Sequence, residues 1–233
     1  MVKIENIGLP EPSGALLATA GEKPRLIMVQ LLDDNEVADF GREVSLIEGA
    51  MDGKAFVMAG MHIREWHLEL TPWPDSHISR DPRVGTMAED TLRKLTDSLL
   101  PYLRKDFGEL PLILGGYSLG GLFADWAARK TDTFNGIAAV SPSLWIEDWD
   151  KFAEANPIHT GCVYLSLGDR EEQTKNKFIA RVGDRVREES RRLAAELGEG
   201  RTVLEWNKGG HFVGSAERTA AGFAWCGNKL LHQ

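Results

Sequence analysis

The chain has 233 residues, of which 42% are hydrophobic, 8% aromatic and 27% charged. This composition is that of an ordinary globular protein, and it excludes intrinsic disorder, coiled coils and collagen. The 35 Asp and Glu residues outnumber the 27 Lys and Arg residues, and the resulting net charge of −8 disfavours nucleic acid and anionic membrane surfaces as partners. The length fits one large α/β domain over residues 1–233.

The cysteines and the first residues indicate the compartment. Cys162 and Cys226 are the only cysteines, too few for a disulfide framework, and neither lies in a C-x-x-C motif. The first ten residues are polar and contain Glu5, unlike a signal peptide, and no stretch reaches about 18 apolar residues. We therefore expect a soluble, unprocessed protein of the cytoplasm.

Short apolar runs rich in branched residues alternate along the chain with longer helical patterns. The runs predict strands over residues 25–32, 55–63, 110–114, 136–140, 162–167 and 202–206, with antiparallel edge strands at Val2–Ile7 and 15–20. The helical patterns cover residues 87–105, 121–130, 178–197 and 216–231, and the Pro-containing segment 70–84 is the longest expected loop. This alternation predicts a mostly parallel sheet with helices on both faces and functional loops at the carboxyl ends of the strands.

A nucleophile elbow is indicated directly after the third of the parallel strands. Residues 115–121 read GGYSLGG, which contains G-x-S-x-G, and Gly116 and Gly120 would let strand and helix cross closely. The motif alone arises in roughly one random chain in ten of this composition, so the buried strand before it and the helix after it carry the inference. Ser118 is the predicted nucleophile, and the backbone N–H of Leu119 is the predicted first oxyanion donor. The alternative is a Gly-rich turn in which Ser118 only caps a helix.

A serine nucleophile requires a base, and the base follows the nucleophile and the acid in the chain order that accompanies this elbow. His211 satisfies that order, because it lies in a glycine loop after the strand 202–206. The other five histidines are excluded by their position before Ser118, at the amino end of a strand, or next to the terminus: His62, His67, His77, His159 and His232.

The third group should orient the histidine, and it should follow the strand 162–167. The loop 168–176 reads GDREEQTKN and offers three carboxylates, Asp169, Glu171 and Glu172. At least one or two of them are expected to be solvated loop charges.

Five segments follow one another along the chain: LTPWP at 70–74, GGYSLGGLF at 115–123, SPSLW at 141–145, SLGDREE at 166–172 and GGHF at 209–212. Together they resemble the putative-esterase branch of the α/β-hydrolase superfamily, which includes esterase D-like and enterochelin-esterase-like proteins. The resemblance implies an α/β-hydrolase fold without a large lid domain, and a Ser, acid, His esterase. It also selects Glu171 as the acid, because the acid of relatives commonly lies three residues after the glycine that ends its strand.

One segment departs from the family pattern. Relatives tend to carry an acidic, glycine-containing turn that supplies the second oxyanion donor, whereas residues 31–36 read LLDDNE and contain no glycine. We place the second donor at the backbone N–H of Leu32 or Asp33.

Aromatic residues mark the predicted substrate site. Trp145 follows the strand 136–140, Trp73 lies in the Pro-containing loop, and Tyr117 precedes the nucleophile, so these three are the predicted substrate-binding residues. They would favour a flat or aromatic acyl or alcohol group. Trp149 stands among acidic residues and more simply pins a loop to the core. Because few residues remain for a lid, we expect a shallow, open pocket suited to small soluble esters.

The predicted function is therefore hydrolysis of small soluble carboxylic esters through an acyl-enzyme on Ser118, with His211 as base and Glu171 as the favoured acid. An acyltransferase with the same triad and a siderophore trilactone esterase are the alternatives, and the intact triad disfavours a scaffold. His62 and His67 are spaced i, i+5 at a strand end, which does not fit a zinc helix, and there is no phosphate-binding loop, so we expect no metal and no cofactor. The charged run 181–201 is expected to be a solvated helix face.

Overall fold

An eight-stranded sheet organises the computed structural model, which describes residues 3–8 and 14–232. The strand order is β1-β2-β4-β3-β5-β6-β7-β8; β1 and β2 pair antiparallel, as do β2 and β4, and every later neighbour is parallel. The strands are β1 (Lys3–Gly8), β2 (Gly14–Ala20), β3 (Ile27–Leu32), β4 (Phe56–His62), β5 (Leu112–Tyr117), β6 (Gly136–Val140), β7 (Cys162–Gly168) and β8 (Thr202–Asn207). The mostly parallel sheet and its antiparallel edge agree with the prediction from the apolar runs, although Val2 lies outside the described residues.

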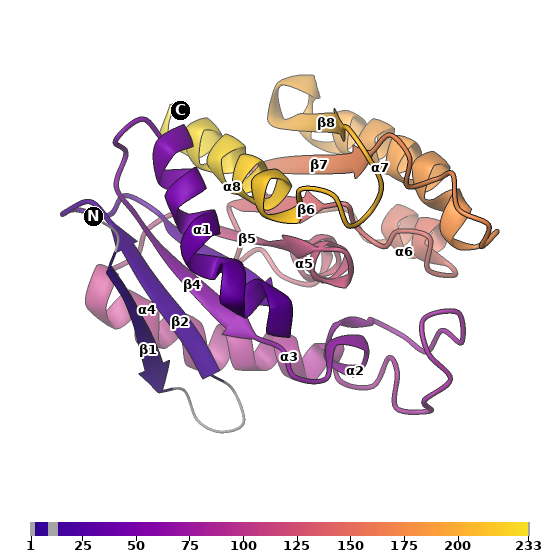
Figure 1. Cartoon of the computed structure of the whole chain (residues 1–233), viewed down its shortest axis with the longest axis horizontal. Coiled ribbons are helices and arrows are strands. Elements are labelled where there is room, and N and C mark those ends of the chain that lie inside the picture. The colour runs from indigo at the N-terminus through magenta and orange to yellow at the C-terminus, as the bar shows by residue number, and fades with distance from the viewer. Residues whose placement is uncertain (1–2, 9–13, 233) are drawn as a thin grey trace.

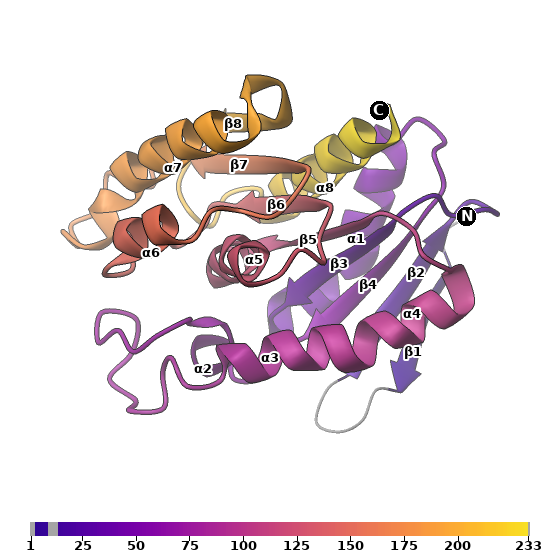
Figure 2. The ribbon, with the colours of Figure 1, turned by 180° about the vertical axis from the view of Figure 1, so that it is seen from behind.

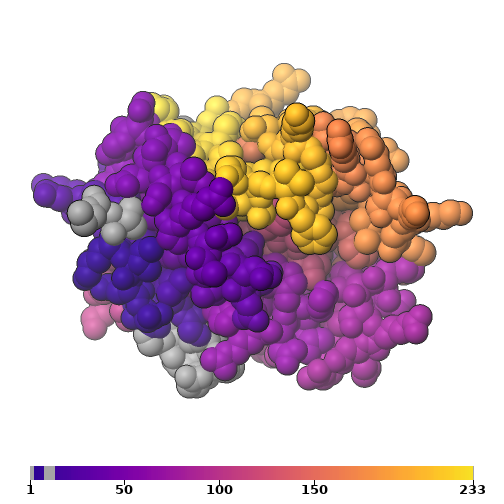
Figure 3. All heavy atoms as spheres, in the orientation of Figure 1, coloured from indigo at the N-terminus to yellow at the C-terminus, as the bar shows by residue number. Residues whose placement is uncertain are grey.

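Helices cover both faces of this sheet (Figures 1 and 2). One face carries α1 (Asp34–Ala50) and α8 (Ser215–Leu231), whose atoms cover the sheet in the space-filling view of Figure 3. The other face carries α3 (Ala88–Lys94), the π-helical turn η1 (Leu95–Leu99), α4 (Leu100–Phe107), α5 (Leu119–Lys130), α6 (Trp149–Ala155) and α7 (Val182–Leu197). The short helix α2 (Trp66–Leu70) and the 3-10 turns Ile179–Arg181 and Glu199–Arg201 lie in connections.

Helix α1 is the main element that the apolar pattern did not predict. Its buried face contains Phe40, Val44 and Ile47, but a buried acid, Glu43, interrupts the apolar periodicity. The helix begins with a capping box: the Asp33 side chain accepts from the N–H groups of Asn35 and Glu36, and the Glu36 side chain accepts from the Asp33 N–H. The acidic segment beside the predicted second oxyanion donor is therefore the start of a helix.

Glu43 fastens α1 to the centre of the sheet. Gln30 lies in the middle of β3, and its Nε2 donates to Glu43 Oε2 at 2.6 Å. Burial raises the pKa of the Glu43 carboxyl to about 8, because the charged form loses its hydration; the Gln30 hydrogen bond opposes this and nearby acids add to it. Gln30 Oε1 is buried without a partner among the described residues.

Replacing Glu43 by Gln should change how stability depends on pH. Because the folded pKa lies above the ordinary value of 4.5, the stability that neutral Glu43 contributes is present at low pH and is lost as pH rises towards 8. The parent should therefore lose free energy of unfolding relative to Glu43→Gln as pH rises from 5 to 8, by up to about 1.4 kcal/mol per pH unit. Urea unfolding at each pH measures the difference, and a difference independent of pH would contradict the assignment.

Candidate active site

Ser118 occupies a strained turn between β5 and α5. Its backbone lies at φ 57° and ψ −115°, a conformation that side-chain-bearing residues rarely adopt. A Cβ on Gly116 would lie 2.9 Å from the backbone of Gly120, so the crossing of strand and helix requires glycine there. The Ser118 N–H donates to the Val140 carbonyl at 3.0 Å, which holds the turn against β6. This is the geometry of a nucleophile elbow.

Three side chains that are distant in sequence meet at the carboxyl ends of β5, β7 and β8. His211 Nε2 lies 3.0 Å from Ser118 Oγ, and His211 Nδ1 lies 2.7 Å from Glu171 Oε2. Parallel strands end at the same edge of a sheet, so the loops after them meet there. Chemically, such an arrangement can supply a nucleophile, a base and an orienting acid.

The structure separates the three carboxylates of the loop after β7. Glu171 is buried and faces His211. Glu172 instead forms a two-pronged ion pair with Arg187 of α7, with both contacts at 2.9 Å. Asp169 Oδ1 accepts from the Gly209 N–H at 2.8 Å and so joins the acid loop to the histidine loop. Only Glu171 therefore has the position of a triad acid.

Glu171 is held in its ionised form by several donors. Its Oε1 accepts from the Gly168 N–H at 2.7 Å, the Ser141 hydroxyl at 2.8 Å and an Arg218 Nη at 2.9 Å. Burial pushes the pKa of the Glu171 carboxyl upwards, but the hydrogen bond and charge of His211 and the bonds from Gly168 and Ser141 outweigh it and leave the pKa below its usual value. Glu171 can thus act as a fixed negative charge.

Arg218 and Tyr117 hold the histidine loop in place. The buried Arg218 guanidinium of α8 contacts Glu171 and donates to the carbonyls of Lys208 and Gly210 at 3.2 Å. The Tyr117 hydroxyl donates to the His211 carbonyl at 2.6 Å and accepts from Arg218 at 3.1 Å. Tyr117 does not line the cavity that the described residues form, so its predicted place in the substrate site is replaced by a structural one. Arg218 lay in a predicted helix, but no sequence pattern marked it.

A cavity of about 540 Å³ opens above Ser118. It lies between the loop after α2 and the loop before α7, which Figure 1 shows at the same end of the sheet. Its lining includes Trp145, a predicted substrate-binding residue, and Leu119, whose N–H is the predicted oxyanion donor. Four basic residues also line it: His67, His77, Arg170 and His211. The lining residues that the sequence analysis did not assign to the site are Trp66, His67, His77, Ile78, Ser141, Ser143, Arg170, Gln173, Thr174, Ile179, Val182 and Phe212. Phe212 follows His211 directly and is 94% exposed. Its place in the GGHF segment was the only feature of the sequence that pointed to it.

Neither Trp73, a predicted substrate-binding residue, nor Leu32, a predicted oxyanion donor, lines the cavity that the described residues form. The Trp73 indole N–H donates to the Glu147 carbonyl at 2.9 Å, and its ring stacks on Trp149 with a centroid distance of 6.3 Å. Trp73 therefore joins its loop to the segment 147–149, and its role in substrate binding stays a prediction. Leu32 ends β3 opposite His62, and the Asp33 N–H is taken by the capping box. The second oxyanion donor at Leu32 stays a prediction.

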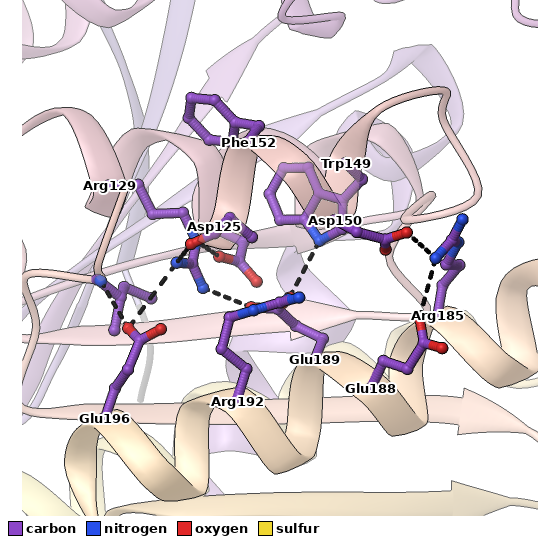
Figure 4. A network of polar contacts seen from close by, with 12 residues as sticks. Asp125, Arg129, Trp149, Asp150, Phe152, Arg185, Glu188, Glu189, Arg192 and Glu196 are labelled. Carbon is purple, nitrogen blue, oxygen red and sulfur yellow. Dashed lines mark hydrogen bonds and ion pairs between the residues drawn. The ribbon is translucent and has the colours of Figure 1, made fainter. Parts of the chain in front are cut away.

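A buried ionic network holds the helices behind the cavity (Figure 4). Arg129 of α5 bonds Asp125 at 2.9 Å and also pairs with Glu189 of α7, and the Trp149 indole N–H donates to Glu189 at 3.1 Å. Burial and the charge of Glu189 raise the pKa of Asp125 to about 7. Because Glu189 is buried, the expectation of a solvated face over the run 181–201 is wrong at this position.

Asp75 joins two loops at the cavity rim. Its Oδ1 accepts from the His77 N–H at 2.7 Å and lies 2.9 Å from His77 Nδ1, while its Oδ2 accepts from the Glu147 N–H at 2.9 Å. Asp75, His77 and Glu147 also offer ligand atoms within 4.8 Å of one another. Both Asp75 oxygens already have protein partners, so these contacts account for its burial as a link between the loops.

Most of the chain matches one known protein family. Residues 29–212 match the family model described as Putative esterase, which covers most of the chain. The chain belongs to this esterase family. It is therefore a carboxylic ester hydrolase, as predicted. A search of curated proteins finds no match.

Solved structures share the fold of this esterase. Siderophore hydrolase EstA from Aspergillus nidulans matches with a TM-score of 0.71 and 17% identity, over 97% of this chain and 94% of that one. An IroE-like serine hydrolase from Shewanella oneidensis matches with a TM-score of 0.74 and 15% identity, over 97% and 79%. The enterobactin esterase FES from Shigella flexneri matches with a TM-score of 0.68 and 17% identity, over 99% of this chain and 60% of that one. The α/β-hydrolase fold is confirmed. Within the described part of the chain, no helix is long and apolar enough to cross a bilayer.

Removing the Arg218 guanidinium should destabilise the esterase markedly. Arg218→Met leaves the buried Glu171 carboxylate without its cationic partner, and breaking a buried pair in this way costs about 3 kcal/mol or more. The matched control is Arg187→Met, which breaks the exposed pair with Glu172 and should cost about 1 kcal/mol or less. Urea unfolding at pH 7 compares the two variants, and equal losses would contradict the role of Arg218.

Proposed function

We propose that this esterase hydrolyses small soluble carboxylic esters through an acyl-enzyme on Ser118, with His211 as general base and acid and Glu171 as the orienting carboxylate. The observation that carries the proposal is the unbroken chain of contacts from Ser118 Oγ to His211 to Glu171, at 3.0 Å and 2.7 Å, beside the cavity. Family membership supports ester hydrolysis as the reaction.

Acylation would begin with a proton transfer from the nucleophile. Because ionised Glu171 can only accept, it fixes the proton of neutral His211 on Nδ1 and leaves the Nε2 lone pair facing Ser118 Oγ. As Oγ attacks the ester carbonyl, Nε2 takes the hydroxyl proton, and the carbonyl oxygen becomes an oxyanion. The Leu119 N–H at the start of α5 is the proposed donor to that oxyanion. His211 then gives its Nε2 proton to the leaving alcohol.

Deacylation would reverse these roles with water. His211 Nε2 removes a proton from a water molecule, the resulting hydroxide adds to the acyl carbon, and the C–Oγ bond breaks as Oγ recovers the proton. The products are the free acid and the regenerated Ser118 hydroxyl. An alcohol in place of water would give the acyltransferase reaction, so product analysis in mixed water and alcohol measures the partition.

The cavity supports an acyl or alcohol group with a sizeable apolar part. Trp66, Trp145 and Ile78 supply large apolar surface, and a volume of about 540 Å³ lies within the range of small-ligand sites. A second candidate is a siderophore ester, because two of the structural relatives are named siderophore hydrolase and enterobactin esterase. A panel of chromogenic esters of increasing acyl length, run beside a catecholate trilactone, distinguishes the two substrate classes.

Loss of the nucleophile should abolish turnover. Ser118→Ala should keep the parent unfolding midpoint and lower kcat by about 10⁴ to 10⁶, because no acyl-enzyme can form. Ester hydrolysis measures kcat, and labelling by a fluorophosphonate reports the reactive serine independently. Turnover within tenfold of the parent would overturn the mechanism.

The three loop carboxylates should respond unequally to neutralisation. Glu171→Gln keeps the shape of the side chain but removes the charge that orients His211, so kcat should fall by about 10² to 10⁴. Asp169→Asn and Glu172→Gln are the matched controls and should stay within about tenfold, because their partners are Gly209 and Arg187. A greater loss in either control than in Glu171→Gln would refute the assignment of the acid.

A further inference from the structure

The turn after β6 contacts both ends of the proposed triad. Ser141 has a left-handed backbone at φ 43°, and its N–H donates to the Ser166 carbonyl at 3.0 Å while its hydroxyl donates to Glu171. Two residues later, the Ser143 N–H donates to the Ser118 carbonyl at 3.1 Å. This short segment is therefore fastened to β7, to the acid and to the nucleophile turn.

The Ser143 side chain reaches the nucleophilic oxygen itself. Ser143 Oγ lies 3.3 Å from Ser118 Oγ and lines the same cavity, although Ser143 is 96% buried as a residue, with 4% exposed. Among the described residues, Ser118 is the one hydrogen-bond partner of this hydroxyl. The backbone of Ser143 is already held by its own N–H, so the hydroxyl is not needed to fix the turn.

The position of the Ser118 hydroxyl proton sets the direction of this hydrogen bond. Ser118 has one hydroxyl proton, and in the reactive arrangement it points to His211 Nε2, whose lone pair faces it. Ser118 Oγ can then only accept from Ser143. The Ser143 hydroxyl is thus the donor in the contact whenever His211 is ready to act as a base.

We propose that Ser143 is a further catalytic residue, whose hydroxyl donates a hydrogen bond to Ser118 Oγ and stabilises the negative charge that develops there. The inference rests on the proposed function. In acylation the charge develops as the proton of Ser118 passes to His211 and the Oγ–carbon bond forms. In deacylation it develops as that bond breaks, its electron pair returns to Oγ, and His211 supplies the proton. Ser143 keeps its own proton throughout.

Such a donor should affect the rates of both half-reactions and leave binding unchanged. A single neutral hydrogen bond of 3.3 Å to the reacting atom corresponds to a rate effect of about tenfold. A structural role would instead lower the unfolding midpoint or raise KM. The contrast between kcat and KM therefore separates the two roles.

The test compares Ser143→Ala with Ser166→Ala. Ser166 is buried in β7, and its hydroxyl has no hydrogen-bond partner among the described residues, so its loss is a matched deletion outside the triad. Ser143→Ala should lower kcat about tenfold, with KM within about twofold and the unfolding midpoint unchanged. Stopped-flow hydrolysis of a chromogenic ester should show that burst and steady-state rates both fall, and the fluorophosphonate labelling rate should fall with them. Ser166→Ala should match the parent in all of these.

Three outcomes would decide against Ser143. They are a kcat of Ser143→Ala within twofold of the parent, a rise in KM with no change in kcat, and a fall in kcat equal to that of Ser166→Ala. A third variant, Ser143→Thr, retains the hydroxyl and should recover most of the lost kcat if the donor is the cause; no recovery in a variant that unfolds at the parent midpoint also overturns the proposal. Ser118→Ala, measured in parallel, keeps the two hypotheses distinct. If it stays active, the proposed function fails; if it is inactive while Ser143→Ala is unaffected, only the role of Ser143 fails.

Discussion

The buried carboxylate of Glu171 is the point on which the candidate site depends. A carboxylate removed from water is stable only when its oxygens are fully hydrogen-bonded and its charge is compensated. Here four groups from separate parts of the chain meet that requirement: the Gly168 N–H, the Ser141 hydroxyl, the Arg218 guanidinium and the His211 ring. Each of these groups lies on, or next to, a loop that forms the site. Satisfying one charge therefore fixes the positions of the histidine loop, the turn after β6 and the start of α8.

A second cluster of buried charges, between α5 and α7, must likewise be hydrogen-bonded and compensated. Arg129, Asp125 and Glu189 are buried together, and Trp149 adds its indole N–H to the network. This cluster fixes α7 and the start of α6 against α5, the helix that begins directly after Ser118. Trp73 stacks on Trp149 and so connects this cluster to the loop that contains Asp75 and His77 at the cavity rim. Charges in the interior thus join the helices and loops that surround the cavity.

The elements whose signals are local were predictable. Strands β5, β6 and β7 are near-continuous apolar runs because both faces of the parallel sheet are buried there, and this pattern placed them within a few residues. The edge strand β8 is partly exposed, but its short apolar run placed it equally well. Helix α1 was not predicted, because its apolar stripe is interrupted by Glu43, and only its partner Gln30 across the helix–sheet contact explains a buried acid there. The start of α1 was not predicted for a different reason: the acidic residues 33–36 form a capping box, and a capping box and an acidic loop have similar composition.

The sequence alone determined the candidates for the chemistry of this protein: the elbow around Ser118, the chain order that selects His211, and the family resemblance that selects Glu171. Those signals are local, because a strained turn requires glycine at set spacings and each loop follows its own strand. Only the tertiary structure decided which side chains surround the reacting atoms. Tyr117 and Trp73 form hydrogen bonds to loop carbonyls, while Trp66 and Phe212 line the cavity. Arg218 and Ser143 contact residues of the proposed triad. Contacts of this kind join positions 25 to 101 residues apart, and no spacing along the chain encodes them.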